Sequence, residues 1–218
     1  MLRLSVGDEV VLLDNSGKEY SAVIAAAEKR CMKLHVIGEN EGDREATADV
    51  ALLFGYLKNA DKNEFIVQKA VELGVKKIVA FSSEYSSAYM NENKLERLNK
   101  VSREAAKQCL RSVAPRVIYC GDFQSALKEA DGYENKLFAC EFAKDSEAEL
   151  STLKGGCALI VGSEGGFSEK EAALAKENGF SSITLGKRIL RAETAAVALT
   201  AVVMFSLGEL GGRRGGKE

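Results

Sequence analysis

The sequence contains little of what metal-binding or disulfide-stabilised proteins depend on: its 218 residues include no tryptophan, one proline and one histidine. The five cysteines, at positions 31, 109, 120, 140 and 157, show neither C-x-x-C nor metal-ligand spacing, and only His35 is available to assist them. Hydrophobic residues make up 46% of the chain, which is ample for a packed core. We therefore expect reduced thiols, no metal site and a fold held together by its core.

Long hydrophobic runs and an excess of either charge are also missing. The longest apolar run, Ala195 to Leu207, is too short to span a bilayer, and no basic segment followed by an apolar stretch stands at the N-terminus. We expect a cytoplasmic protein that has no membrane partner. Thirty basic against thirty-two acidic residues give a net charge of -2, which by itself argues weakly against a nucleic-acid partner.

What the sequence does contain is two successive patterns of predicted elements. Residues 1–47 predict short strands separated by turns, such as the turn at Asp14 to Gly17. From Asp49 onward, strands alternate with helical segments, which predicts parallel β-α-β units in an open α/β sheet. We expect a small β domain at 1–47, an α/β domain at 48–210 and a disordered tail at 211–218.

A basic stripe is predicted on one long helix, from Asn93 to Arg111. The apolar residues of this helix share one face, and four basic side chains lie opposite them: Lys100, Arg103, Lys107 and Arg111. An ordinary solvated helix has the same appearance, so the pattern alone favours that interpretation over a nucleic-acid contact.

Two segments, Leu159 to Ser168 and Leu185 to Ala195, repeat one arrangement: a hydrophobic strand, a glycine-containing turn and then a helix. Two such strand ends at the carboxyl edge of a sheet could present backbone groups to one ligand. Neither segment carries G-x-x-x-x-G-K-[ST] or G-x-G-x-x-G, so neither a P-loop nor a Rossmann nucleotide site is indicated.

Together these segments resemble the signature of the SPOUT methyltransferases, in particular the RsmE family of 16S rRNA (uracil-N3)-methyltransferases. That signature reads G-P-E-G-G-F/W-[ST]-x-x-E, followed by L-G-x-x-I-L-R-x-E-T-A. The first motif matches from Gly162 to Ser168 and at Glu171, except that Ser163 stands where the family has proline, and the second matches at every fixed position. Further likeness runs through Lys62 to Gly74 and Glu104 to Arg111, so it covers nearly the whole chain.

The resemblance implies a C-terminal SPOUT α/β domain with a trefoil knot and an N-terminal PUA-like β-barrel that binds RNA. Met1 to Asp8 already corresponds to the V-L-R-L-x-x-G-D segment of the family, so we expect the barrel to lack its opening strand. The implied cofactor is S-adenosylmethionine and the implied partner is 16S rRNA of the small ribosomal subunit. A homodimer built partly by the helix Ala195 to Leu207 is also implied. Because of the resemblance, we expect Arg3 and the four residues of the basic stripe to contact RNA.

Most of the expected site residues come from the same motifs, whose glycines let the backbone approach a cofactor closely. The resemblance also implies that the strand end at Cys140 and Glu141 lines the cofactor pocket. Glu164 and Glu193 are candidates to favour the cationic sulfonium, and Arg191 is the candidate to pair with the target phosphate or to polarise the uracil carbonyl. Each of them also has a structural role available, in a turn, at a helix N-terminus or in an ion pair. Cys140 is expected as a pocket wall and not as a nucleophile, since N3 methylation needs no covalent adduct. The expected cofactor-binding residues are Cys140, Glu141, Val161, Gly162, Glu164, Gly165, Leu185, Gly186, Ile189, Leu190, Arg191, Thr194 and Ala195.

The expected function is therefore methyl transfer from S-adenosylmethionine to N3 of a uridine in 16S rRNA. The residues leave two alternatives open: a SPOUT enzyme that methylates another RNA position, such as a ribose 2′-oxygen, and a non-catalytic RNA-binding module. The I-L-R-x-E-T-A loop favours the first of the three.

Overall fold

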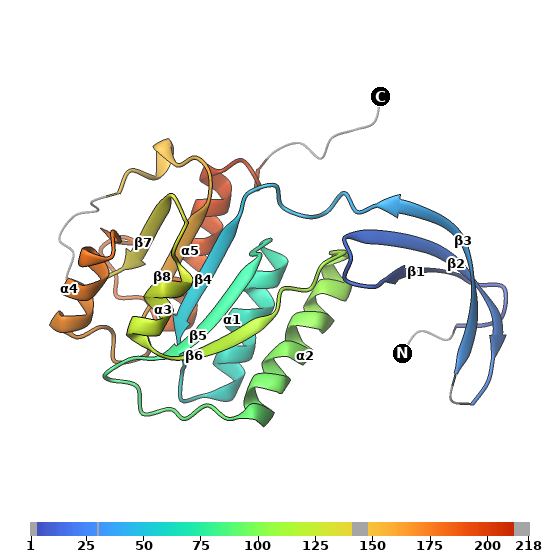
Figure 1. Ribbon diagram of the computed structural model, residues 1–218, viewed down its shortest axis with the longest axis horizontal. Helices are drawn as coiled ribbons and strands as arrows, with labels where there is room; N and C mark the ends of the chain where they lie inside the picture. The colour runs from blue at the N-terminus through green and yellow to red at the C-terminus, as the bar shows by residue number, and fades with distance from the viewer. Residues whose placement is uncertain (1–3, 30, 141–147, 212–218) are drawn as a thin grey trace. The chain divides into compact units, whose positions relative to one another are not determined.

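The computed structural model of this chain describes residues 4–29, 31–140 and 148–211 (Figure 1). The chain divides into two compact units. It first passes from one unit to the other between Glu45 and Ala46, close to the boundary predicted after residue 47. Residues 106–114, which we predicted to belong to the α/β domain, cluster with the N-terminal strands. The smaller unit is Met1–Glu45 with Ala106–Ala114, and the larger is Ala46–Ala105 with Pro115–Glu218.

The larger unit is built on a parallel sheet of six strands in the order β6-β5-β4-β8-β7-β9. Its central strands β4 and β8 are apolar and buried along their whole length, as parallel strands covered on both faces must be. This is the α/β sheet that the alternating pattern predicted. The strands are β4 (Val50–Gly55), β5 (Lys77–Ser82), β6 (Val117–Asp122), β7 (Asn135–Ala139), β8 (Cys157–Val161) and β9 (Ser181–Ile183).

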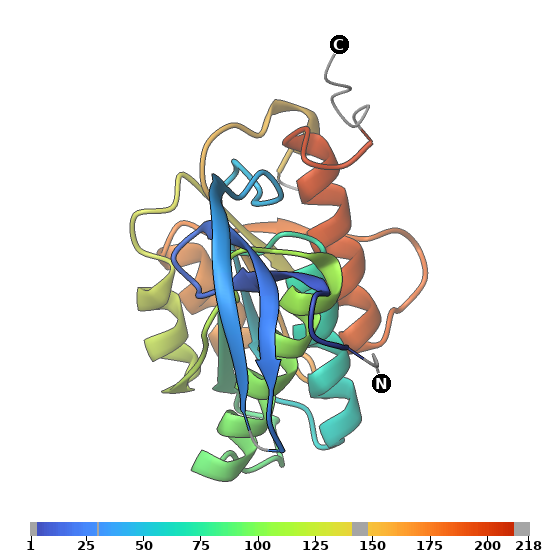
Figure 2. The ribbon, with the colours of Figure 1, turned by 90° about the vertical axis from the view of Figure 1, so that its right-hand side faces the viewer.

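Helices cover both faces of this sheet (Figures 1 and 2). Helices α3 (Phe123–Glu129) and α4 (Glu169–Glu177) pack on one face, where their side chains share an apolar core with β4, β5, β7 and β8. Helices α1 (Ala60–Glu72) and α5 (Ala192–Ser206) pack against each other, and α5 also contacts β4 and β8. Helix α2 (Glu92–Cys109) is joined to α1 by the ion pair of Arg97 and Glu64. The short helix η1 spans Leu150–Thr152.

The path of the chain through the sheet brings the two motif segments together. After α3 the chain crosses to β7, returns to β8 beside β4, and then passes outward to β9 beyond β7. The resemblance places the knot in this part of the chain. Because all these strands are parallel, the segments that follow β8 and β9 leave the sheet at the same edge, as predicted.

The smaller unit contains an antiparallel sheet in the order β1-β2-β3, formed by β1 (Glu9–Leu13), β2 (Lys18–Ala27) and β3 (Met32–Glu41). The predicted turn at Asp14 to Gly17 joins β1 and β2. Asn15 and Gly17 adopt positive φ values of 70° and 94° there, which asparagine and glycine tolerate better than other residues.

The predicted helix Asn93 to Arg111 is wrong at its C-terminal end. Helix α2 ends at Cys109, and Leu110 adopts a left-handed φ of 61°. Arg111 is only 4% exposed, and its guanidinium donates to Glu45 at 2.7 Å. Burial raises the pKa of Glu45, but hydrogen bonds from Arg111 and from the Val113 backbone outweigh it and hold the pKa below its usual value. Arg111 therefore belongs to an internal ion pair and not to the predicted basic stripe.

Helix α5 is apolar on nearly all sides, as its sequence predicted, and it starts at Ala192 rather than at Glu193. Ala196, Leu199 and Val203 are fully buried, whereas Val202 and Phe205 are 40% and 65% exposed. Within the described ranges, no helix is both long enough and apolar enough to cross a membrane.

Candidate functional site

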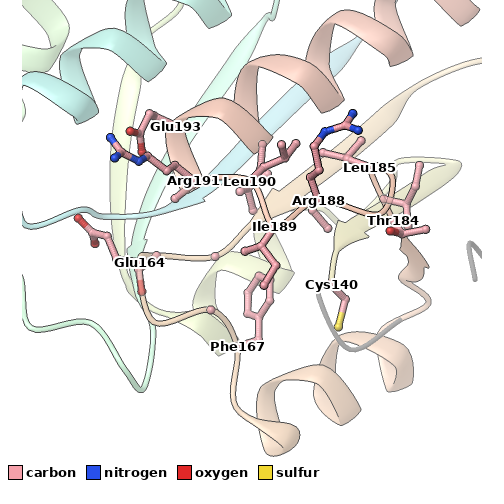
Figure 3. Close-up of a pocket in the computed structure, with 18 of the residues that line it drawn as sticks. Cys140, Glu164, Phe167, Thr184, Leu185, Arg188, Ile189, Leu190, Arg191 and Glu193 are labelled. Carbon is pink, nitrogen blue, oxygen red and sulfur yellow. The ribbon is translucent and has the colours of Figure 1, made fainter. Parts of the chain in front are cut away.

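A cavity of about 650 Å³ opens at the carboxyl ends of β7, β8 and β9 (Figure 3). Its walls come from the turn after β8, the loop after β9 and the first turn of α5, so the two predicted motif segments form one site. The lining residues are Lys62, Ala139, Cys140, Val161, Gly162, Ser163, Glu164, Gly166, Phe167, Ile183, Thr184, Leu185, Gly186, Lys187, Arg188, Ile189, Leu190, Arg191, Ala192, Glu193 and Ala195.

The turn after β8 is tight because its glycines leave room for backbone. Gly166 adopts a φ of 68°, and its N–H donates to the carbonyl of Ser163 at 3.0 Å. A Cβ on Gly162 would lie 3.2 Å from the Gly166 carbonyl carbon, and a Cβ on Gly55 would lie 2.5 Å from the Ser163 nitrogen. Side chains at these positions would push the turn away from β4, so the glycines set the shape of the cavity floor.

Ser163, which replaces the proline of the family motif, is buried and satisfied. Its hydroxyl lies 2.9 Å from the hydroxyl of Ser83, which follows β5. This hydrogen bond ties the turn after β8 to the end of β5, so the departure from the motif adds a polar link between two strand ends.

Glu171, the last residue of the first motif, has a structural role. Its Oε2 accepts from the Ser168 backbone at 2.9 Å, and the Ser168 hydroxyl accepts from the Glu171 backbone, which forms a capping box at the start of α4. Its Oε1 accepts from the backbone of Glu84 at 2.9 Å. Glu171 therefore fixes both the helix that follows the turn and the loop that follows β5.

The loop between β9 and α5 forms the opposite wall. Gly186 adopts a φ of 99°, a conformation that side chains rarely permit. The basic residues Lys187 and Arg188 and the apolar Ile189 are exposed here, Ile189 to 88%. Arg191 is the N-cap of α5, and its carbonyl accepts from the Ala195 backbone at 2.8 Å. The second motif is thus a loop of exposed side chains that ends in a firmly started helix.

Glu193 brings a charged carboxylate to the cavity. Its Oε1 pairs with Lys62 Nζ at 3.1 Å, whereas its Oε2 is buried without a hydrogen-bond partner in the described part of the chain. Burial raises the pKa of Glu193, but its own backbone N–H, the ion pair with Lys62 and the nearby Arg191 outweigh burial and lower it. Glu193 is therefore ionised at neutral pH, and one of its oxygens is free to favour a cation.

Three further predicted side chains, those of Arg191, Glu164 and Cys140, also border the cavity. Figure 3 shows Arg191 and Glu193 close together at the start of α5, with Glu164 on the turn below them. Glu164 is exposed, and its Oε1 accepts from the Lys58 backbone at 3.2 Å. Cys140 lies at the end of β7, where its N–H donates to Ile183 at 3.2 Å, and it is 8% exposed. This thiol is part of the cavity wall, as predicted.

Most of the predicted site residues line this cavity, and a few do not. Gly165 and Thr194 are not among its lining residues. A Cβ on Gly165 would lie 2.7 Å from the Cβ of Tyr85, so this glycine accommodates the loop after β5 and not the cavity. Glu141 and Arg3 lie outside the described residues. The predicted residues that do line the cavity are Cys140, Val161, Gly162, Glu164, Leu185, Gly186, Ile189, Leu190, Arg191, Glu193 and Ala195.

Several lining residues were not predicted from the sequence. Lys62 stands at the start of a segment that resembled the family, but nothing in that pattern linked it to Glu193. Lys187 and Arg188 are variable positions of the second motif. Phe167 is a motif residue whose ring packs 5.5 Å from Phe123 in the core, while the residue also borders the cavity. No cluster of metal-ligating side chains occurs among residues 4–29, 31–140 and 148–211.

Family models and curated proteins match most of this chain. The profile of a family described as an RNA methyltransferase domain matches residues 44–204, and one described as an RNA methyltransferase PUA domain matches residues 2–35. Ribosomal RNA small subunit methyltransferase E of Mesomycoplasma hyopneumoniae is 36% identical over 77% of this chain and 74% of its own length. The protein of that name from Bacillus subtilis is 31% identical over 93% of this chain and 84% of its own.

A solved structure has the same fold with the cofactor in place. The crystal structure of a ribosomal RNA small subunit methyltransferase E from Neisseria gonorrhoeae bound to S-adenosyl methionine matches with a TM-score of 0.85. The two proteins are 29% identical, and the match covers 94% of this chain and 86% of that one.

Proposed function

This chain belongs to the RsmE family of RNA methyltransferases, and from that premise we propose that it methylates N3 of a uridine in the 16S rRNA of the small ribosomal subunit. It is an S-adenosylmethionine-dependent rRNA methyltransferase. The observation that supports the proposed reaction most strongly is that the two motif segments converge on one cavity of about 650 Å³ at the carboxyl edge of the sheet.

The residues present fit S-adenosylmethionine. Gly162, Gly166 and Gly186 allow the backbone to approach a flat nucleoside, and the cavity has the size of a small-molecule site. The Oε2 of Glu193, which is buried and has no hydrogen-bond partner among the described residues, complements a positive charge. When bound, S-adenosylmethionine supplies an activated methyl group on a cationic sulfonium.

The side chains at the cavity then have distinct tasks. Arg191, at the start of α5, lines the cavity. In the proposed reaction it holds a uracil carbonyl and stabilises the negative charge that develops when N3 loses its proton. Glu193 offsets the positive charge of the methyl donor, and Lys62 keeps this carboxylate ionised and oriented. Glu164 is a second carboxylate at the rim. Holding both reactants in one orientation supplies much of the rate enhancement that such a displacement needs.

Two parts of the chain are proposed to contact the RNA substrate: the basic side chains of α2 and the N-terminal segment. Lys100, Arg103 and Lys107 are exposed along α2 and form a basic stripe that can follow a phosphate backbone. The segment 1–47 is proposed as a PUA-like RNA-binding domain and 48–210 as the methyltransferase domain. Because the substrate is ribosomal RNA, the proposal places the protein in the cytoplasm.

We also propose that the protein works as a homodimer. Helix α5 carries Val202 and Phe205 on its outer side, 40% and 65% exposed, and Ile189 in the preceding loop is 88% exposed. A monomer would leave these apolar groups in water, whereas a second subunit would bury them.

The test is to incubate 16S rRNA from a strain that lacks the gene with the protein and S-adenosylmethionine, and then to analyse its nucleosides. N3-methyluridine is the expected product. A methyl group on a ribose 2′-oxygen would support the first alternative, and RNA binding without any transfer would support a non-catalytic module.

A further inference from the structure

The connection between β5 and α2 exposes two tyrosines at the functional edge of the sheet. Tyr85 is 56% exposed and Tyr89 is 74% exposed, although both are large and partly apolar. Figure 1 shows this connection running along the edge where the parallel strands end. Exposed aromatic rings that lie next to a site and are left out of the core indicate a binding surface.

This connection is held in place by the rest of the site. The Ser83 hydroxyl pairs with that of Ser163 at 2.9 Å, and the Glu84 backbone donates to Glu171 at 2.9 Å. The Ser86 hydroxyl donates to the carbonyl of Tyr56 at 3.1 Å, and Met90 is buried with 5% exposed. The backbone is therefore anchored on both sides of Tyr85, while the rings of Tyr85 and Tyr89 reach into solvent.

The anchoring sets Tyr85 directly beside the turn that forms the cavity floor. The Cβ of Tyr85 lies so close to Gly165 that a side chain on this glycine would meet it at 2.7 Å. Gly165 stands between Glu164 and Gly166, both of which line the cavity. A molecule that reaches the cavity over this turn would pass the tyrosines.

A cation lies next to the second ring. Lys94 Nζ is 5.9 Å from the ring centroid of Tyr89 and 5.9 Å from that of Tyr56, and it donates to the carbonyl of Tyr89. Glu84 and Glu92 lie nearby in the chain, so the surface is mixed in charge, but the cation is the group fixed at the ring. An aromatic face beside a fixed cation suits a ligand that has flat rings and negative charges.

We propose that Tyr85 and Tyr89 form a stacking platform for unpaired bases of the RNA that flank the methylated nucleotide. The inference rests on the proposed function for the identity of the ligand. Methylation at N3 requires an unpaired base, since N3 of a paired uracil is engaged in the duplex, and unpaired neighbours can stack on aromatic side chains. The platform would hold the strand while the target base enters the cavity.

The test uses variants that remove the flat ring and variants that keep it. Tyr85→Leu with Tyr89→Leu removes both rings, whereas Tyr85→Phe with Tyr89→Phe keeps them. Loss of stacking should weaken the binding of a short single-stranded oligoribonucleotide that carries 2-aminopurine about tenfold and abolish the fluorescence quenching that stacking causes. The phenylalanine variant should behave like the wild type.

A matched control is available on helix α1. Phe65 is 43% exposed and has Lys69 Nζ 5.9 Å from its ring, which is the same pairing as that of Tyr89 with Lys94. Phe65→Leu should leave RNA binding unchanged. The variants with leucine at Tyr85 and Tyr89 should raise KM for 16S rRNA about tenfold, with kcat within about twofold of the wild type and with unchanged affinity for S-adenosylmethionine. An unchanged cofactor affinity would also show that the double leucine variant is folded. If the double variant does not fold, Tyr89→Leu alone is the milder variant to test.

The outcomes separate this inference from the proposed function. A wild-type protein that transfers no methyl group to rRNA contradicts the proposed function, while the oligoribonucleotide assay still decides the stacking. Wild-type quenching and KM in the leucine variants would overturn the platform even if methylation is normal. A lower mass of these variants in sedimentation would assign the tyrosines to a contact between subunits and would also overturn it.

Discussion

Glu193 brings a carboxylate to the cavity, and the contacts of its two oxygens determine its charge state and its pairing. Lys62 on α1 pairs with one oxygen, and the other is buried without a partner within the described residues. The lowered pKa keeps the carboxylate ionised at neutral pH. An ionised, incompletely paired carboxylate in a small-molecule site distinguishes a cationic ligand from a neutral one.

The first prediction uses this difference. S-adenosylmethionine carries a sulfonium charge, whereas its demethylated product S-adenosylhomocysteine is a neutral thioether. Glu193→Gln should therefore weaken S-adenosylmethionine binding about tenfold, or about 1.4 kcal/mol, and change the affinity for S-adenosylhomocysteine little. Isothermal titration calorimetry with both compounds measures the two affinities.

Glu164→Gln is the matched control, because Glu164 lines the same cavity but is exposed to solvent. Its effect should be smaller, since water screens an exposed charge. An equal loss of affinity for both compounds in Glu193→Gln would show that Glu193 shapes the cavity and does not recognise charge.

At this scale the sequence predicted the residues within motifs and missed those that packing brings in. Glu193 and Gly162 could be found because they are fixed positions of a motif that resembled the family. Lys62 could not, because its contact with Glu193 arises from the packing of α1 against α5. Gly165 was predicted to touch the cofactor, but its reason to be glycine is the close approach of Tyr85.

At the scale of whole elements, the alternation of patterns predicted the parallel sheet and its helices, but not how α2 ends. The periodicity that placed Arg111 on the basic stripe runs on past Cys109, whereas Leu110 turns the chain into a left-handed conformation. Leucine rarely adopts that conformation, so no local signal marks the helix end. Tertiary contacts such as the one between Arg111 and Glu45 decide it.

A second prediction concerns the remaining basic stripe on α2. Arg103→Glu with Lys107→Glu should weaken RNA binding and reduce the slope of log affinity against log salt by about one to two units, since fewer counterions are released. Affinity for S-adenosylmethionine should stay at the wild-type value, because neither residue lines the cavity. Filter binding over a salt series gives the slope, and an unchanged slope would exclude α2 from the RNA surface.

A third prediction concerns the pairing of Glu45 with Arg111 in the smaller unit. The pKa of Glu45 is lower in the folded protein than its ordinary value of 4.5, so the pair stabilises the fold above that pH and loses its effect as pH falls through the folded value. Glu45→Gln should lower the free energy of unfolding by about 2 kcal/mol at pH 7, because Arg111 is left buried without its carboxylate.

Urea unfolding followed across pH measures this effect. The difference between the wild type and Glu45→Gln should shrink as the pH is lowered below about 4, where the carboxyl group becomes protonated. Asp43→Asn serves as the control, since Asp43 is 83% exposed and its contact with Arg44 is long at 3.7 Å. A difference that persists unchanged at low pH would mean that shape and not charge determines the contribution of Glu45.

At the scale of the whole molecule, the fourth prediction is the oligomeric state. The wild type should sediment as a homodimer, and Phe205→Glu should dissociate it, because a charge would be placed in the apolar surface of α5. Analytical ultracentrifugation over a range of concentrations measures both masses. A wild-type mass that stays monomeric at every concentration would contradict the dimer.

The fold of the whole chain was predictable in outline because the alternating pattern indicated a parallel α/β sheet and the two motif segments resembled one family. The assignment of residues 106–114 was not predictable, because these residues include the last turn of α2 and nevertheless cluster with the N-terminal strands in the smaller unit. Contacts between residues far apart in the chain, such as Ala114 with Asn15 at 2.6 Å, carry no signal in local composition.

The central claim is tested most directly by the nucleoside composition of 16S rRNA after reaction with this protein and S-adenosylmethionine. RNA taken from cells that lack the gene should gain N3-methyluridine at one position, and Arg191→Ala should reduce this gain at least about a hundredfold because the developing charge on uracil loses its partner. The appearance of the methyl group on a ribose or on another base would contradict the proposed N3 chemistry. The absence of any transferred methyl group from the wild-type reaction would contradict the enzyme itself.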